Sequence, residues 1–199
     1  MAQVFLGMSG GVDSSAAAVL LQEQGYAVSG LHLSLLSGLP LPADRLPDDG
    51  SDARAVASLL GLPFYDMDLS PEFRATVIDY FIREYEAGRT PNPCVFCNRR
   101  IKFGAMWDAA QKLGADYLAT GHYAKIRQDP ATGRHLLCRG ADPSKDQSYF
   151  LCRLTQEQLS RTLFPLGDLE KPAVRALAEA HGLINAQKRD SQDICFVPD

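Results

Sequence analysis

The sequence lacks the features of a membrane protein, of a disulfide-rich secreted protein and of a strongly basic nucleic-acid-binding protein. Its 199 residues include five cysteines and one tryptophan. No apolar stretch is long enough to cross a bilayer, and the first residues lack the basic start and cleavage site of a secretory signal. Acidic residues outnumber basic residues by 24 to 20, which argues against nucleic-acid binding by the whole surface. We therefore expect a soluble, cytoplasmic protein with no membrane partner.

The remaining composition is that of one ordinary globular domain, with 46% hydrophobic and 22% charged residues. Short apolar runs alternate with segments of helical periodicity that end at glycines. Strands are predicted over residues 4–8, 27–33, 64–67 and 117–120, a hairpin over 124–128 and 135–139, and helices over 14–24, 51–60, 71–87, 99–113 and 172–181. This order predicts an α/β fold, a doubly wound parallel sheet with helices on both faces and a small C-terminal appendage.

The first predicted strand ends in a glycine-rich loop that suits an anion. Ser9, Gly10 and Gly11 lead into a helix that starts near Asp13, so N–H groups, hydroxyls and a helix N-terminus surround one small volume. The glycines allow positive φ and let the backbone approach a phosphate. Asp13 would repel bare phosphate and is better suited to hold Mg²⁺ beside it. A capped helix after a tight turn is the alternative interpretation.

The same loop resembles the PP-loop of the N-type ATP pyrophosphatases. It reads Ser9-Gly10-Gly11-Val12-Asp13-Ser14-Ser15. Members of that superfamily cleave ATP between the α- and β-phosphates and leave AMP on a substrate oxygen. No Gly-Lys-Ser/Thr follows the glycines, so the loop differs from a Walker loop. The resemblance implies adenylation of a substrate with ATP and Mg²⁺ as cofactors.

Two cysteines lie in a proline-containing segment, residues 90–98, which we expect to be a rigid loop before a helix. Cys94 and Cys97 are three positions apart, and a helix N-terminus lowers the pKa of a nearby thiol. We therefore expect exposed, reactive thiolates, although half of a metal site or inert thiols would give the same spacing. Cys138 and Cys152 are expected to be packing residues.

Further segments resemble the tRNA-specific 2-thiouridylases, which replace the C2 oxygen of the wobble uridine with sulfur. The matching segments, which follow the family's order along the whole chain, are residues 88–93, 97–103, 119–124, 145–151 and 190–196. The resemblance assigns residues 1–140 to the PP-loop ATP-pyrophosphatase domain and residues 141–199 to a mainly helical extension that carries Cys195. It also implies tRNA and a sulfur donor protein as partners.

By that resemblance, Cys97 and Cys195 are the paired catalytic thiols, and Cys195 carries the persulfide. The residues that would hold ATP are Gly7, Met8, Ser9, Gly10, Gly11, Val12, Asp13, Ser14, Ser15, Leu33 and Gly121. The target base would face Asn92, Pro93 and Cys94, and tRNA would contact His122, Lys145, Asp146 and Gln147. A structural role for the histidine and solvation of the charged pair are the alternatives.

Cys94 leaves the sulfur route open, because some family members have aspartate at the matching position. Three thiolates, Cys94, Cys97 and Cys195, would suit a [4Fe–4S] cluster with one iron open to sulfide, whereas a persulfide route uses the same cysteines. We expect either a Cys97–Cys195 disulfide or two sulfurs far apart, with the Cys195 segment displaced.

The family continues beyond the second cysteine motif with further domains that help to hold tRNA, and we expect those domains to be absent here. A basic cluster, Arg89, Arg99, Arg100 and Lys102, could meet phosphates or form a solvated face. Two other functions stay open, a PP-loop synthetase of a small metabolite and a non-catalytic partner that carries sulfur or metal.

Overall fold

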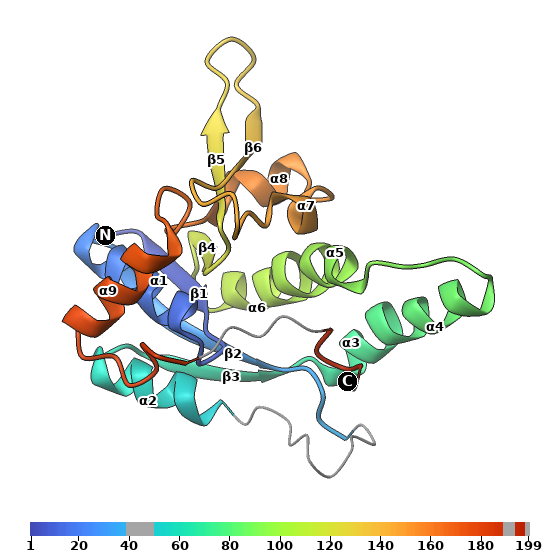
Figure 1. The fold of residues 1–199 in the computed structure, drawn as a ribbon, viewed down its shortest axis with the longest axis horizontal. Helices are drawn as coiled ribbons and strands as arrows, with labels where there is room; N and C mark the ends of the chain where they lie inside the picture. Colours follow the sequence, from blue (N-terminus) through green and yellow to red (C-terminus); the bar gives the residue numbers. More distant parts are fainter. Residues whose placement is uncertain (39–49, 189–193, 198–199) are drawn as a thin grey trace.

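A five-stranded parallel sheet forms the centre of the protein in the computed structural model, which describes residues 1–38, 50–188 and 194–197 (Figure 1). The strand order is β3-β2-β1-β4-β7, and each neighbouring pair runs in parallel. The strands are β1 (Gln3–Gly7), β2 (Ala27–Ser34), β3 (Phe64–Asp68), β4 (Tyr117–Thr120) and β7 (Thr162–Leu163). The first four were predicted. The fifth was missed because two residues carry no readable periodicity.

Alternating side chains of β1 point to opposite faces of the sheet, as the period of a strand requires. Val4 and Leu6 belong to a core cluster with α1 (Val12–Glu23), α2 (Ser51–Leu59) and α9 (Lys171–Ala180). Phe5 belongs to a second cluster, to which the helices of the other face contribute. Helices therefore cover both faces, and the predicted doubly wound α/β fold is confirmed.

The second face is covered by two long helical runs. One consists of α3 (Ser70–Phe73), the π-helical segment η1 (Arg74–Ile78) and α4 (Asp79–Glu86). The other consists of α5 (Pro93–Cys97), the π-helical segment η2 (Asn98–Ala105) and α6 (Met106–Lys112). The second run starts earlier than predicted, because Asn92 accepts a hydrogen bond from the Val95 N–H (3.3 Å) and Pro93 occupies the first turn. The expected loop is therefore present at residues 90–92 and wrong for residues 93–98, since both cysteines are helical.

The predicted hairpin is present as β5 (Ala124–Gln128) and β6 (His135–Arg139), and it projects from the body of the domain (Figure 1). Two short helices follow it, α7 (Ser148–Leu151) and α8 (Gln156–Ser160). The chain then returns to the sheet. Leu166, Val174 and Ala178 are buried in the same cluster as β1, so this part of residues 141–199 shares the central core. No helix in the described ranges is long and apolar enough to cross a membrane.

Candidate active site

The glycine-rich loop connects β1 to the start of α1, as the sequence predicted. Gly10 has a φ of +68°, and a side chain there would meet the Asp52 Cβ at 2.7 Å. Gly11 has a φ of −87°, so only one of the two glycines uses the left-handed region. Gly11 is the N-cap of α1 and has no side chain that could cap the helix. The first N–H groups of α1 therefore receive no hydrogen bond from the N-cap residue, which suits an incoming anion.

The serines of the loop hold it in shape. The Ser14 hydroxyl donates to the Gly11 carbonyl (3.1 Å) and accepts from the Ser9 N–H (3.3 Å). The Ser15 hydroxyl donates to the same carbonyl (3.0 Å). Ser9 itself is exposed, whereas Ser14 and Ser15 are buried. Hydrogen bonds of the loop's own serines thus fix its conformation at the start of α1.

The other residues that the resemblance assigned to ATP lie on neighbouring strands. Gly121 follows β4, and a side chain there would meet the Ser14 nitrogen at 2.8 Å, so the backbone passes directly against the first turn of α1. Leu33 is partly buried near the end of β2. Gly7 and the buried Met8 lie at the end of β1 itself. The candidate residues therefore gather at the carboxyl ends of three adjacent parallel strands, where α/β sheets bind ligands.

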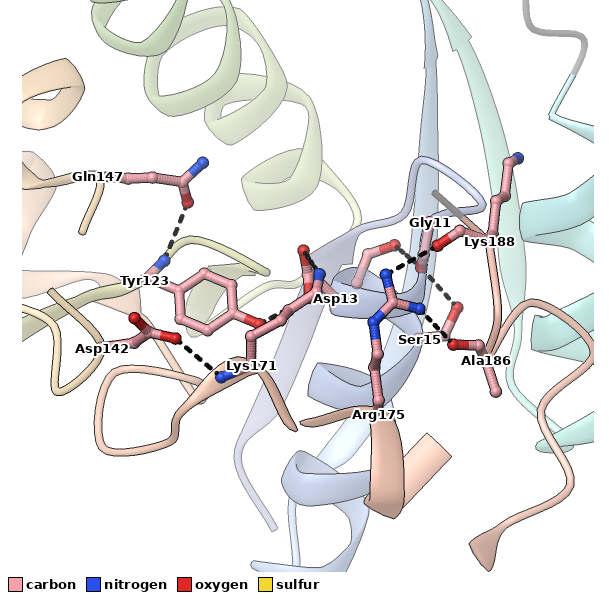
Figure 2. Close-up of polar contacts among 11 residues, drawn as sticks. Gly11, Asp13, Ser15, Tyr123, Asp142, Gln147, Lys171, Arg175, Ala186 and Lys188 are labelled. Carbon is pink, nitrogen blue, oxygen red and sulfur yellow. Dashed lines mark hydrogen bonds and ion pairs between the residues drawn. The ribbon is translucent and has the colours of Figure 1, made fainter. Parts of the chain in front are cut away.

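Asp13 is the centre of a polar network that joins three distant segments (Figure 2). The Lys171 ammonium, from the start of α9, lies 2.7 Å and 2.9 Å from the two carboxylate oxygens of Asp13. The Tyr123 hydroxyl donates to the same carboxylate at 2.8 Å. The backbone N–H of Lys171 in turn donates to Asp142 (3.0 Å). A cation and a phenol thus meet the one acidic side chain of the loop.

The segment after α9 lies along the other side of the loop. The Asn185 amide donates to the Gly10 carbonyl (3.0 Å) and to the Ser15 hydroxyl (2.8 Å). Arg175 donates to the carbonyls of Ala186 and Lys188, which fixes this segment against α9 (Figure 2). The Asn185 side-chain oxygen is buried and accepts no hydrogen bond from the described residues. Buried polar atoms normally form hydrogen bonds, so this oxygen is an acceptor near the loop that the described residues leave unused.

Sequence reasoning missed Tyr123, Lys171, Asn185 and Lys188. Lys171 had one readable signal, because it is the first residue of α9 and a helix N-terminus disfavours a positive charge. A lysine in that position needs a nearby anion, and Asp13 is that anion. Asn185 and Lys188 lie in a stretch without periodicity, so nothing in the sequence pointed to their contacts with the loop.

The three candidate thiols do not have the properties that the sequence suggested. Burial raises the pKa of Cys97 to about 11 and also raises the pKa of the half-buried Cys94. Cys195 is exposed, as expected, but desolvation of its sulfur raises its pKa as well. The positive charge of Lys102 opposes the rise in all three cases, and the negative charge of a Cys195 thiolate adds to the rise at Cys97. Cys97 is 8% exposed. The expected exposed, low-pKa thiolate at Cys97 is therefore wrong, because desolvation dominates and Cys97, the last residue of α5, lies beyond the first turn where the helix N-terminus acts.

All five cysteines are free, so the expected Cys97–Cys195 disulfide is not formed in this structure. Among the described residues, no three histidine, cysteine or carboxylate side chains are close enough to hold a metal ion. Cys152 is exposed, contrary to its expected packing role, and Cys138 is half-buried.

The residues assigned to tRNA have structural contacts of their own. His122 is buried, its Nδ1 lies 2.7 Å from the Thr120 hydroxyl, and burial lowers its pKa well below the usual range. Asp146 accepts from the N–H groups of Gly140 (3.0 Å) and Ser148 (3.3 Å). Gln147 accepts from the Tyr123 N–H (3.0 Å) and so supports the residue that contacts Asp13. Lys145 is half-buried in the same turn.

The basic cluster is partly neutralised within the protein. The Arg89 guanidinium forms two hydrogen bonds, both 2.7 Å long, with the Glu84 carboxylate. Such a bidentate pair competes with phosphate for the arginine. Lys102 faces the thiols closely enough for its charge to act on them.

Comparison with protein families gives one match over almost the entire chain. The family model described as "tRNA methyl transferase HUP domain" matches residues 2–199. A protein named tRNA-specific 2-thiouridylase MnmA from Treponema denticola is 53% identical over 99% of this chain and 54% of its own length. A protein of the same name from Lactococcus lactis subsp. cremoris is 52% identical over 98% of this chain and 52% of its own length. The chain thus spans about half the length of the curated relatives that it matches.

Solved structures share the fold at low sequence identity. The U34-tRNA thiolase NcsA from Methanococcus maripaludis, solved with its [4Fe–4S] cluster, has a TM-score of 0.56 at 21% identity, over 92% of this chain and 57% of that chain. An NMN synthetase from Francisella tularensis has a TM-score of 0.53 at 17% identity, over 94% of this chain and 66% of that chain. These similarities establish the fold alone.

The Asp13–Lys171 pair should contribute measurably to stability. We expect Lys171→Met to lower the free energy of unfolding by about 1–3 kcal/mol, since it leaves a part-buried carboxylate without its cation. Asp13→Asn combined with Lys171→Met should recover part of that loss, because both charges are then removed. Urea denaturation of the unchanged protein, the two single variants Asp13→Asn and Lys171→Met, and the double variant measures the coupling. Lys125→Met, which breaks an ion pair with the exposed Asp168, should change stability by less than about 1 kcal/mol. Additive losses at Asp13 and Lys171 would contradict the coupling.

Cys97 should react slowly with iodoacetamide near neutral pH, because a thiol with a pKa of about 11 is almost fully protonated there. Its alkylation rate should rise roughly tenfold per pH unit until the pH approaches that value. Mass spectrometry of each cysteine peptide gives the rate, with the exposed Cys152 as the internal reference. Alkylation of Cys97 as fast as that of Cys152 at pH 7.5 would contradict the buried, protonated state.

Proposed function

The chain belongs to the family described as tRNA methyl transferase HUP domain, and we propose that it carries the catalytic steps of an ATP-dependent tRNA-uridine 2-sulfurtransferase. One observation carries the proposal. The chain combines a loop that suits pyrophosphate with two cysteines, distant in sequence, whose segments meet: Cys97 belongs to a core cluster against which Phe196, next to Cys195, packs. Adenylation needs the first feature, and transfer of sulfur between two cysteines needs the second.

In the proposed first step, the C2 oxygen of the uridine attacks the α-phosphorus of ATP. The bond from that phosphorus to the bridging oxygen breaks, and its electron pair leaves with pyrophosphate. The open N-terminus of α1 would hold the anion, in keeping with its uncapped N–H groups. Lys171 supplies a positive charge at the loop, which has no lysine of its own.

Mg²⁺ would neutralise phosphate charge when bound, and Asp13 is the residue proposed to hold it. The carboxylate oxygens of Asp13 are suitable ligands, and in the absence of the ion they are held by Lys171 and Tyr123. A divalent cation would therefore compete with the ammonium for the same oxygens. Lys171, which contacts the same carboxylate, would supply a further positive charge for the phosphates.

In the proposed second step, the terminal sulfur of a Cys195 persulfide bonds to C2, and AMP leaves with the former C2 oxygen. The Cys97 thiolate then attacks the Cys195 sulfur and forms a disulfide. The sulfur–sulfur bond breaks, and its electron pair stays with the sulfur on C2, which becomes the thiocarbonyl. The two cysteines are oxidised in this step, so a thiol reductant must restore them before the next turnover.

Two partners follow from this chemistry. The substrate is a tRNA uridine, in line with the names of the relatives at about 50% identity. A sulfur donor protein is required because each turnover consumes the outer sulfur of Cys195. The cluster route would need Cys94, Cys97 and Cys195 to converge on iron, and the described residues do not form such a ligand set.

The assay that tests the proposal measures AMP and pyrophosphate release with and without unmodified tRNA. We expect release that depends on tRNA and on Mg²⁺. Asp13→Asn should reduce it by about 100-fold or more, because the proposed ligand of the metal is lost. Asp168→Asn, which removes an exposed carboxylate from another ion pair, is the matched control and should leave release unchanged.

Each outcome of that assay separates the candidate functions. AMP release that needs a small metabolite and not tRNA would identify a synthetase. No AMP release by a folded, Mg²⁺-supplied protein with tRNA would indicate a carrier of sulfur or metal. Undiminished release by Asp13→Asn would reject the assignment of the loop.

A further inference from the structure

Phe196, the residue next to Cys195, contacts the helical run α3–η1–α4. This run precedes α5, which carries Cys94 and Cys97. The Phe196 ring meets the Phe73 ring edge-on, with centroids 5.7 Å apart and an interplanar angle of 75°. It also meets the Phe81 ring, with centroids 5.2 Å apart and an angle of 89°. The C-terminal segment accordingly lies beside α3 (Figure 1). Both contacts have the T-shaped geometry that aromatic rings prefer.

Local backbone structure transfers this contact to Cys195. The Val197 N–H donates to the Ile194 carbonyl (3.0 Å), which closes a turn with Cys195 and Phe196 at its two central positions. Because the Phe196 ring is held in place at the second central position, the positions that Cys195 can take at the first are restricted. Phe196 also packs against the core cluster that contains Phe73 and Cys97. The turn thus brings the exposed cysteine to the part of the protein where Cys97 is buried.

We propose that Phe196 is a positioning residue, an aromatic anchor that holds the Cys195 sulfur within reach of Cys97 during sulfur transfer. The anchor is at the edge of the protein, since Phe81 belongs to α4, a helix without a buried residue. Undocking of Phe196 would uncover the buried Phe73 at the edge of the core cluster but no buried residue of α4. With the Phe196 ring docked, Cys195 is placed to transfer its sulfur to the substrate. With the ring undocked, Cys195 is accessible to the donor protein that supplies the sulfur.

The test follows disulfide formation between Cys97 and Cys195 in the reduced chain, with diamide as the oxidant that takes up the two thiol hydrogens. Peptide mass spectrometry identifies the pair formed and its rate. Phe196→Ala should slow formation of the Cys97–Cys195 disulfide by about tenfold or more, because loss of orientation lowers the effective concentration of one thiol at the other. Phe196→Tyr, which retains the ring, should restore the rate.

Two variants on α4 complete the test: one breaks the same contact from the other side, and one is a matched control. Phe81→Ala removes the ring that contacts Phe196 and should reproduce the slow rate. Tyr85→Ala removes an exposed ring that contacts Phe81 (4.8 Å) one helical turn away, and it should leave the rate unchanged. If Phe196→Ala fails to fold, Phe81→Ala still tests the same contact. A native rate in both folded alanine variants would overturn the anchor.

The inference rests on the proposed sulfur transfer, but its test needs neither ATP nor tRNA. Failure of tRNA-dependent AMP release therefore leaves the disulfide measurement interpretable, and the reverse also holds. In the complete reaction, Phe196→Ala should leave AMP release within about twofold and lower the yield of thiolated uridine by about tenfold. Equal loss of AMP release and thiolation would indicate a general structural role.

Discussion

The contact between Asp13 and Lys171 joins the two parts of the chain on which the candidate site depends. The carboxylate stands at the start of α1, and the ammonium comes from the start of α9, 158 residues later in the sequence. Each charge would be unfavourable without the other. The Asp13 carboxylate alone would repel an incoming phosphate, and the Lys171 ammonium alone would face the positive end of its own helix. Tyr123, held by Gln147, brings the loop after β4 to the same point. The ion pair thus sets the distance between α9 and the anion loop.

Much of the fold could be predicted because its signals are local. Alternation of apolar strands with helices is enough to predict a parallel sheet with both faces covered, whereas the strand order and the register of β1 with β2 and β4 were not predicted. The errors also have local causes. β7 is too short to show a period, and Asn92-Pro93 is a helix start that also resembles a rigid loop. The two π-helical segments have no sequence signal that we can identify.

The site was predictable only where its residues are consecutive. The sequence predicted the loop from Ser9 to Ser15 together with the strand before it and the helix after it. Positive φ was expected to be allowed at both glycines, but only Gly10 adopts it. The contacts of Lys171 and Asn185 with that loop depend on how α9 packs, and no pattern in one sequence specifies such packing. The properties of the thiols were mispredicted for a physical reason. A helix N-terminus acts over one turn, whereas burial removes water from all sides of the sulfur.

Burial of Cys97 also determines when the proposed chemistry can occur. A pKa of about 11 in place of 9.0 means that the protein favours the protonated thiol by ~3 kcal/mol relative to a solvated cysteine. The resting thiol is therefore a poor nucleophile and is protected from oxidation. Attack on a persulfide requires the thiolate, so the environment must change when substrate binds. The charge of Lys102, which already favours the thiolate forms of Cys94, Cys97 and Cys195, is the force available in the described structure for that change. An anionic phosphate drawn to Lys102 would weaken its stabilisation of the thiolates, and a base that displaced water would strengthen that stabilisation but would also desolvate the thiolates further. The phosphates of the proposed reaction are therefore better held at the loop, where the N-terminus of α1 is uncapped, than at Lys102.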